Sequence, residues 1–184
     1  MRSLLFPCVV ALFFSVLGCG GRVERDAMLE AVLDDFSRRE EISEFGKGDL
    51  LLLSSRTHTW SEEQLRGMGT DPQSACRIPE NLYKRLTEVT ESHSVAHLMP
   101  QSSDWRVATK AQEDKYSDIS NDKIDGRHVK SVVSVSAPGI SSNREEAVVI
   151  VSFSWGMHGG LGRYHLQKHG DKWRINCSRL DFYM

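Results

Sequence analysis

Four glycines lie within seven residues, at Gly156, Gly159, Gly160 and Gly162, around His158. Glycine lets a backbone approach a ligand closely, and an imidazole can act as an acid or a base near neutral pH. A phosphate-binding loop needs a strand before it and a helix after it, whereas the residues after these glycines alternate as a strand does. The stretch is therefore a hairpin connection or glycine bulge, or else a ligand loop in which His158 is the reactive group.

Two histidine pairs have the i, i+4 spacing of a zinc-protease helix, His93 with His97 and His165 with His169. Ser94 stands where that helix needs a glutamate, and a nearby proline makes a helix there doubtful. In a strand, residues four apart are separated by ~13 Å, which is too far for two imidazoles to share one ion. We therefore predict no metal site and no cofactor.

A serine or cysteine hydrolase would need a nucleophile, a base and a group that orients the base. The chain has many serines but no G-x-S-x-G elbow. Cys76 could act as a nucleophile beside a histidine only if it is not in a disulfide. An exported hydrolase that uses His158 or a free Cys76 is therefore the alternative function, and a non-catalytic domain is the leading one.

The first eighteen residues have the features of a secretory signal, with a positive charge at Arg2 and an apolar run over residues 4–17. That run is too short to span a membrane comfortably. It stops at V-L-G-C, residues 16–19, which resembles the lipobox of bacterial lipoproteins. Its first two residues differ from the commonest ones there, Leu and Ala or Ser. The resemblance implies that Cys19 receives a diacylglycerol and becomes the first residue of the mature chain.

This resemblance sets the predicted organisation: a signal peptide over residues 1–18, which is removed, a short anchor linker over 19–24, and a single domain over 25–184. The lipid on Cys19 would hold the domain to a membrane, facing the periplasm or the cell exterior, and on the outer membrane of a Gram-negative cell. The alternatives are an ordinary signal peptide with Cys19 as a chance thiol, and an uncleaved anchor, and all three export the chain. A net charge of −2 gives no basic surplus for binding nucleic acid.

Export also changes what the cysteines can do. Cys8 leaves with the signal peptide and Cys19 is consumed by the lipid, so only Cys76 and Cys177 remain in an oxidising compartment. We predict a disulfide between them, which would close a loop of about a hundred residues and stabilise the fold by ~4 kcal/mol. The alternative is that one of the two is a buried or reactive thiol.

The hydrophobic pattern predicts an α+β fold, with amphipathic helices packed on a curved, mainly antiparallel sheet that ends in a C-terminal meander. Helical spacing of apolar residues predicts helices over 25–42 and 79–91, and Ser61 with Gln64 forms a capping box for a short helix between them. Residues 109–126 are almost all polar and predict a long loop or an irregular helix on the surface. Strands are expected at residues 50–53, 95–99, 105–108, 127–137 and 147–155, followed by two strands joined at Gly170-Asp171.

The end of the chain, A-V-V-I-V, then G-x-x-G-G-x-G-R-Y-x-L, then G-D-K-W-R-I, resembles the C-terminal sheet of nuclear transport factor 2-like domains. It is also similar to a group of uncharacterised bacterial envelope proteins with the same glycine-rich loop. The resemblance covers residues 147–175 and implies a curved sheet around a pocket, with helices in its concave face. It carries over no catalytic residue. We expect a lipid-anchored envelope domain that binds a protein or a small ligand near residues 156–162.

Overall fold

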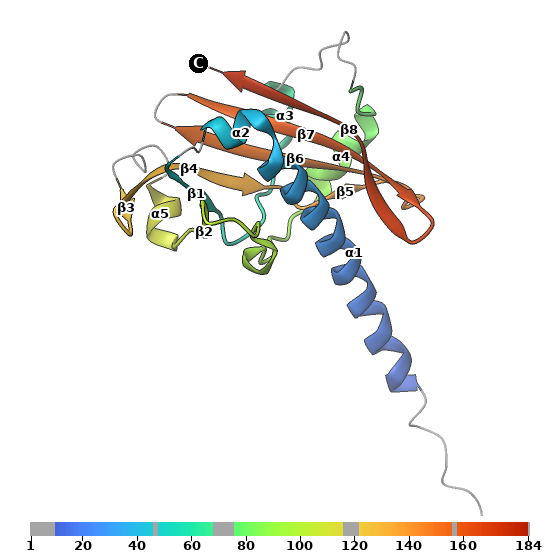
Figure 1. The fold of residues 1–184 in the computed structure, drawn as a ribbon. Coiled ribbons are helices and arrows are strands. Elements are labelled where there is room, and N and C mark those ends of the chain that lie inside the picture. Colours follow the sequence, from blue (N-terminus) through green and yellow to red (C-terminus); the bar gives the residue numbers. More distant parts are fainter. Residues whose placement is uncertain (1–9, 46–47, 68–75, 116–121, 156–157, 184) are drawn as a thin grey trace, which may run out of the picture.

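A computed structural model describes residues 10–45, 48–67, 76–115, 122–155 and 158–183 (Figure 1). Its helices are α1 (Val10–Arg38), α2 (Glu40–Phe45), α3 (Glu62–Gly67), α4 (Glu80–Glu88) and α5 (Lys110–Asp114), with a 3₁₀ helix at Ala96–Leu98. Its strands are β1 (Leu50–Leu53), β2 (Trp105–Val107), β3 (Lys123–Ile124), β4 (Arg127–Val135), β5 (Gly139–Ile140), β6 (Glu146–Trp155), β7 (His158–His169) and β8 (Lys172–Tyr183). The predicted α+β class is confirmed.

The strands form one mixed sheet in the order β2-β1-β4-β6-β7-β8, while β3 pairs with β4 and β5 with β6. Strand β1 runs parallel to both of its neighbours, and the other pairs are antiparallel. The C-terminal strands β6, β7 and β8 follow one another as the predicted meander. Strands β7 and β8 meet at a two-residue turn in which Gly170 has φ 65°, a conformation that favours glycine.

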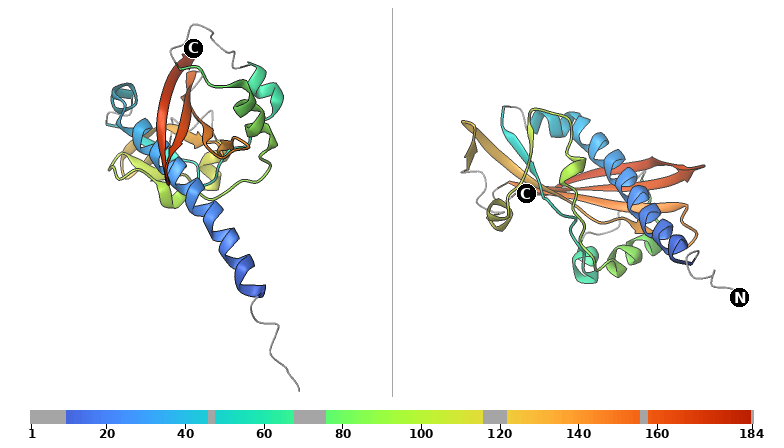
Figure 2. Two further views of the ribbon diagram at one scale, coloured as in Figure 1. Left: turned by 90° about the vertical axis from the view of Figure 1, so that its right-hand side faces the viewer. Right: turned by 90° about the horizontal axis from the view of Figure 1, so that it is seen from below.

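Helices cover both faces of the sheet, with α1 on one face and α3 and α4 on the other (Figure 2). On the α1 face, Phe36 packs against Phe153 and Tyr164 is buried beside them. On the α4 face, Leu82 and Leu86 pack with the buried side chains of β6. Strand β6 is therefore apolar on both faces because each face contacts a helix, which confirms that it is a central strand.

Helix α1 contains the predicted apolar stripe, but its bounds differ from residues 25–42. The helix begins at Val10 and continues through residues 19–24 without a break, so the predicted linker is helical. It ends at Arg38, and α2 follows after Arg39. The N-terminal half of α1 projects away from the rest of the fold (Figure 1). The buried stripe that joins the helix to the sheet is Met28, Leu29, Val32, Leu33 and Phe36.

Four other local predictions meet different outcomes. The capping box before α3 is confirmed, because Ser61 and Gln64 exchange backbone-to-side-chain hydrogen bonds. Residues 95–99 were expected as a strand and form a 3₁₀ turn instead, since the edge of β1 is occupied by β2. Within the expected polar loop, α5 forms because Thr109 and Gln112 make a second capping box. The helix expected over 79–91 is shorter, at Glu80–Glu88.

Candidate functional site

The proposed lipid-attachment residue, Cys19, lies within α1, five residues before Glu24. An α-helix rises ~1.5 Å per residue, so the backbones of these two residues are separated by ~7.5 Å along the helix axis. Among the residues that the structure describes, no helix is both long enough and apolar enough to cross a membrane. Helix α1 first contacts the sheet around Glu24. We call residues 19–27 the root of α1.

Glu24 joins the root of α1 to the end of the sheet. Its side chain is only 13% exposed, and its carboxylate lies 2.6 Å from Lys168 Nζ near the end of β7. Trp173 Nε1 at the start of β8 donates a hydrogen bond to the same carboxylate at 3.2 Å, and Arg144 forms an ion pair with its other oxygen. Lys168 also lies over the Trp173 ring, 5.6 Å from its centroid. One carboxylate therefore joins α1, the β7–β8 hairpin and the loop before β6.

These contacts decide the charge state of Glu24. Burial alone would raise the pKa of its carboxyl group, but the hydrogen bonds from Lys168, Arg144 and Trp173 outweigh burial and lower that pKa below the usual value. The ionised carboxylate is the form that all three donors stabilise. Glu24 is therefore charged wherever the domain is folded near neutral pH.

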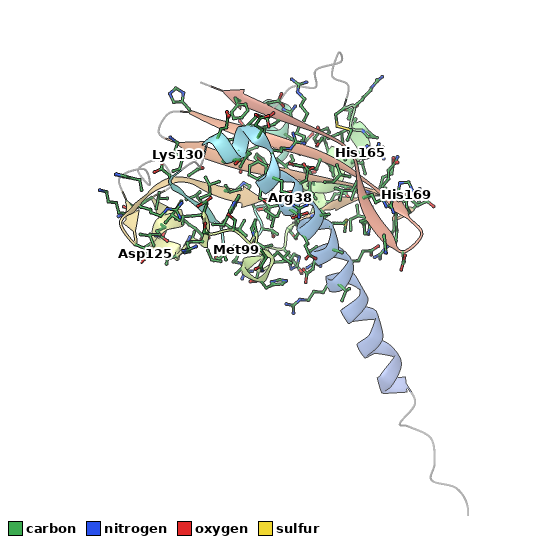
Figure 3. The ribbon with its side chains drawn as sticks, viewed as in Figure 1. Arg38, Met99, Asp125, Lys130, His165 and His169 are labelled. Atoms are coloured by element: carbon green, nitrogen blue, oxygen red, sulfur yellow. A yellow bond between two sulfur atoms is a disulfide. The ribbon has the colours of Figure 1, made fainter. Side chains whose placement is uncertain are left out.

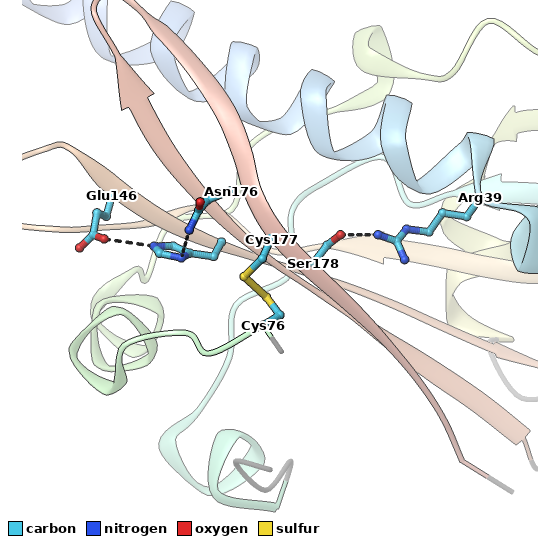
Figure 4. The surroundings of a disulfide bond; sticks show 7 residues. Arg39, Cys76, Glu146, Asn176, Cys177 and Ser178 are labelled. Atoms are coloured by element: carbon cyan, nitrogen blue, oxygen red, sulfur yellow. Dashed lines mark hydrogen bonds and ion pairs between the residues drawn. A yellow bond between two sulfur atoms is a disulfide. The ribbon is translucent and has the colours of Figure 1, made fainter. Parts of the chain in front are cut away.

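The structure joins Cys76 and Cys177 in a disulfide, with Cα atoms 5.4 Å apart and a sequence separation of 101 (Figure 4). This bond ties the segment before α4 to the middle of the edge strand β8. Because both sulfur atoms are used, Cys76 has no thiol for nucleophilic attack, and the hydrolase alternative through a free Cys76 is wrong. Next along β8, Ser178 accepts a hydrogen bond from Arg39, which follows α1.

The predicted glycine-rich loop is largely a strand, and Gly156 lies outside the described residues. Strand β7 begins at His158, which pairs with Trp155, and it contains the other three glycines. A Cβ added at Gly160 would lie 2.3 Å from Phe153 Cζ. This glycine is therefore required by close packing over an aromatic ring of the core, as glycines within strands often are.

The two i, i+4 histidine pairs do not converge, because neither lies on an α-helix. His97 Nε2 lies 3.1 Å from Asp26 of α1, whereas His93 belongs to the segment that pairs with Thr57. His165 is buried, with one ring nitrogen 3.3 Å from Glu146 and the other 3.3 Å from Asn176. Figure 3 shows His165 and His169 at the hairpin end of the sheet. Within the described ranges, no three His, Cys, Asp or Glu side chains are grouped to hold a metal ion.

Sequence reasoning missed two polar clusters of the sheet. On the α4 face, the buried Arg163 of β7 lies 2.9 Å from Asp181 of β8. Asp181 also pairs with Arg179, which lies on β8 as well. Arg163 and Arg179 are directly opposite each other, so the shared aspartate offsets their repulsion. On the α1 face, Arg39 lies over the Tyr164 ring, and burial raises the pKa of that tyrosine well above its usual range. The alternation of residues along β7 and β8 was the available signal. It indicates on which face of the sheet a side chain lies, but not which side chain it contacts.

Comparisons with protein-family models, with characterised proteins and with solved structures find no match to this chain.

Proposed function

We propose that this chain is a bacterial lipoprotein of the cell envelope, anchored by a lipid on Cys19, whose domain over residues 25–184 binds a protein or a small ligand. The observation that carries the proposal is the V-L-G-C sequence directly after a signal-like apolar run. The Cys76–Cys177 disulfide supports it, because such bonds persist mainly in oxidising compartments outside the cytosol. In this proposal the domain faces the periplasm or the cell exterior.

The anchor is tested by expressing the full chain in a bacterium fed radiolabelled palmitate. We expect label in the wild-type chain, no label in a Cys19→Ser variant, and accumulation of the precursor when globomycin blocks lipoprotein processing. A Cys8→Ser variant is the matched control, since Cys8 lies in the proposed signal peptide and its loss should leave labelling unchanged. Labelling that persists in Cys19→Ser would contradict the proposal.

A binding role is supported over catalysis because the buried polar side chains form contacts within the protein. Glu24 and Arg163 each form ion pairs, and His165 contacts Glu146, so that all three join one element to another, as the residues of a scaffold do. The remaining alternative is a hydrolase that uses His158. We expect the purified protein and a His158→Ala variant to show the same background hydrolysis of ester and peptide substrates. Turnover that requires His158 would replace the binding proposal.

We also propose that the fold resembles that of nuclear transport factor 2-like domains, and this proposal concerns the fold alone. Its support is that α1 lies across a sheet ending in the β6-β7-β8 meander, with the predicted hairpin over residues 164–175. A ligand in this proposal lies near the start of β7 at the part-exposed His158, because Gly159 and Gly160 are buried.

A further inference from the structure

The most exposed large apolar side chain in the described part of the chain lies beside the proposed anchor. Val23 is 69% exposed, although Met28 and Leu29, five and six residues later on the opposite face of α1, are fully buried. Val23 follows Cys19 by four residues, which is ~6 Å along the helix axis. Residues four apart share one face of a helix, so Ala27 continues the exposed face of Val23 before Glu30 ends it. An exposed apolar stripe therefore begins one turn after the proposed anchor residue, opposite the core.

Basic side chains lie on both sides of that stripe. Arg22 precedes Val23 by one residue, and its side chain is 70% exposed with only a 3.7 Å pairing to Asp26. On the other side, Glu24 holds Arg144, whose side chain is 60% exposed. An apolar centre with exposed cations beside it suits the boundary between acyl chains and phosphate groups, because arginine can extend its charged end toward the phosphates.

The connection between anchor and domain is short and held in place. Residues 19–24 are helical, and Glu24 is fixed by Lys168 and Trp173, so little free chain separates the lipid from the sheet. A flexible tether of many residues would let the domain sit far from the bilayer. Glu24 lies ~7.5 Å from Cys19 along the helix axis, so it stays within one Debye length, ~8 Å, of the head groups once the lipid on Cys19 is inserted.

We propose that the root of α1 rests directly on the bilayer that holds the lipid, with Val23 entering the head-group region and Arg22 and Arg144 contacting phosphates beside it. This inference rests on the proposed lipid anchor. It also fixes how the domain is oriented, because α1 contacts the membrane by its exposed stripe. Strand β3 lies at the opposite end of the sheet from the β7–β8 hairpin, and it therefore points away from the membrane (Figure 1).

The test uses the full-length, lipidated protein in vesicles of phosphatidylethanolamine and phosphatidylglycerol that carry a head-group nitroxide lipid. A thiol-reactive fluorophore is placed in turn at Val23→Cys, Ala27→Cys and Lys123→Cys. All three positions are exposed, so labelling should leave the fold intact, and Lys123 of β3 is the control. With Cys76 and Cys177 bonded and Cys19 lipidated, the introduced cysteine is the reactive thiol. We expect quenching several-fold stronger at residue 23 than at residue 123, with residue 27 between them.

Palmitate incorporation is measured on the same samples, which separates the two proposals. Equal quenching at residues 23 and 123 in a lipidated protein would overturn the resting orientation and leave the anchor standing. A mature chain without lipid would overturn both. A circular dichroism spectrum of each labelled variant confirms that the helix is preserved.

Discussion

Replacing Glu24 with alanine should loosen the root of α1 from the sheet. The substitution removes the single carboxylate that accepts a hydrogen bond from Trp173 and pairs with Lys168 and Arg144. These three partners follow Glu24 by 149, 144 and 120 residues in the sequence, so the contact joins distant parts of the chain. The buried stripe of α1 remains, and we therefore expect a less stable domain and not an unfolded one.

The magnitude follows from how far each partner is exposed. Trp173 is 8% exposed and the Lys168 side chain 29%, so both would lose a partner with little water to replace it. Hydrogen bonds to charged groups contribute about 1.5–3 kcal/mol each, whereas an exposed pair such as that with Arg144 contributes about 0–1 kcal/mol. Because the contacts share one carboxylate they do not add fully, and we expect a loss of about 3 kcal/mol. For a chain of this length the melting temperature should fall by about 6–12 °C.

The assay is urea unfolding of the full chain in detergent, followed by circular dichroism. Glu30→Ala is the matched control, because Glu30 is an exposed glutamate of the same helix, and surface changes of this kind stay within about 0.5 kcal/mol. A Glu24→Ala midpoint equal to that of Glu30→Ala would refute the view that Glu24 holds the helix to the sheet.

Acid titration of the wild type, the disulfide, and Gly160 give further tests. Since the pKa of Glu24 is lower in the folded state than in the unfolded state, its contribution is fully present above the unfolded pKa and is lost as the pH falls through the folded one. Glu24→Gln should therefore flatten the acid limb of a stability curve measured between neutral and acid pH, and an unchanged limb would exclude this linkage. A Cys76→Ala, Cys177→Ala double variant should lose about 4–5 kcal/mol in a denaturant titration, and an unaltered midpoint would argue against the bond. Gly160→Ala should lose about 1–3 kcal/mol by thermal melting because its Cβ meets Phe153. Gly21→Ala, which meets nothing within 4 Å, should lose nothing, and equal losses would exclude the packing argument.

Local pattern was sufficient to predict several elements. A run that is apolar on both faces predicted the central strand β6, because only a strand covered by helices on both faces needs such a run. Helical spacing predicted the buried face of α1, since periodicity gives the face of an isolated element. The turn at Gly170 followed from residue chemistry alone. The pairing of Cys76 with Cys177 was predicted by counting the cysteines that would remain if the chain is exported, which needs no geometry.

The sequence by itself therefore determined the fold class, the main helices, the closing meander and the cysteine pair. Only the tertiary structure decided which distant residues meet: that β1 runs parallel to β4, that His165 pairs with Glu146 and not with His169, and that the glycines after His158 are required by packing over Phe153. The physical reason is that periodicity is a property of neighbours in the chain, whereas an ion pair such as that of Glu24 with Lys168 exists only once the strands have taken their order in the sheet.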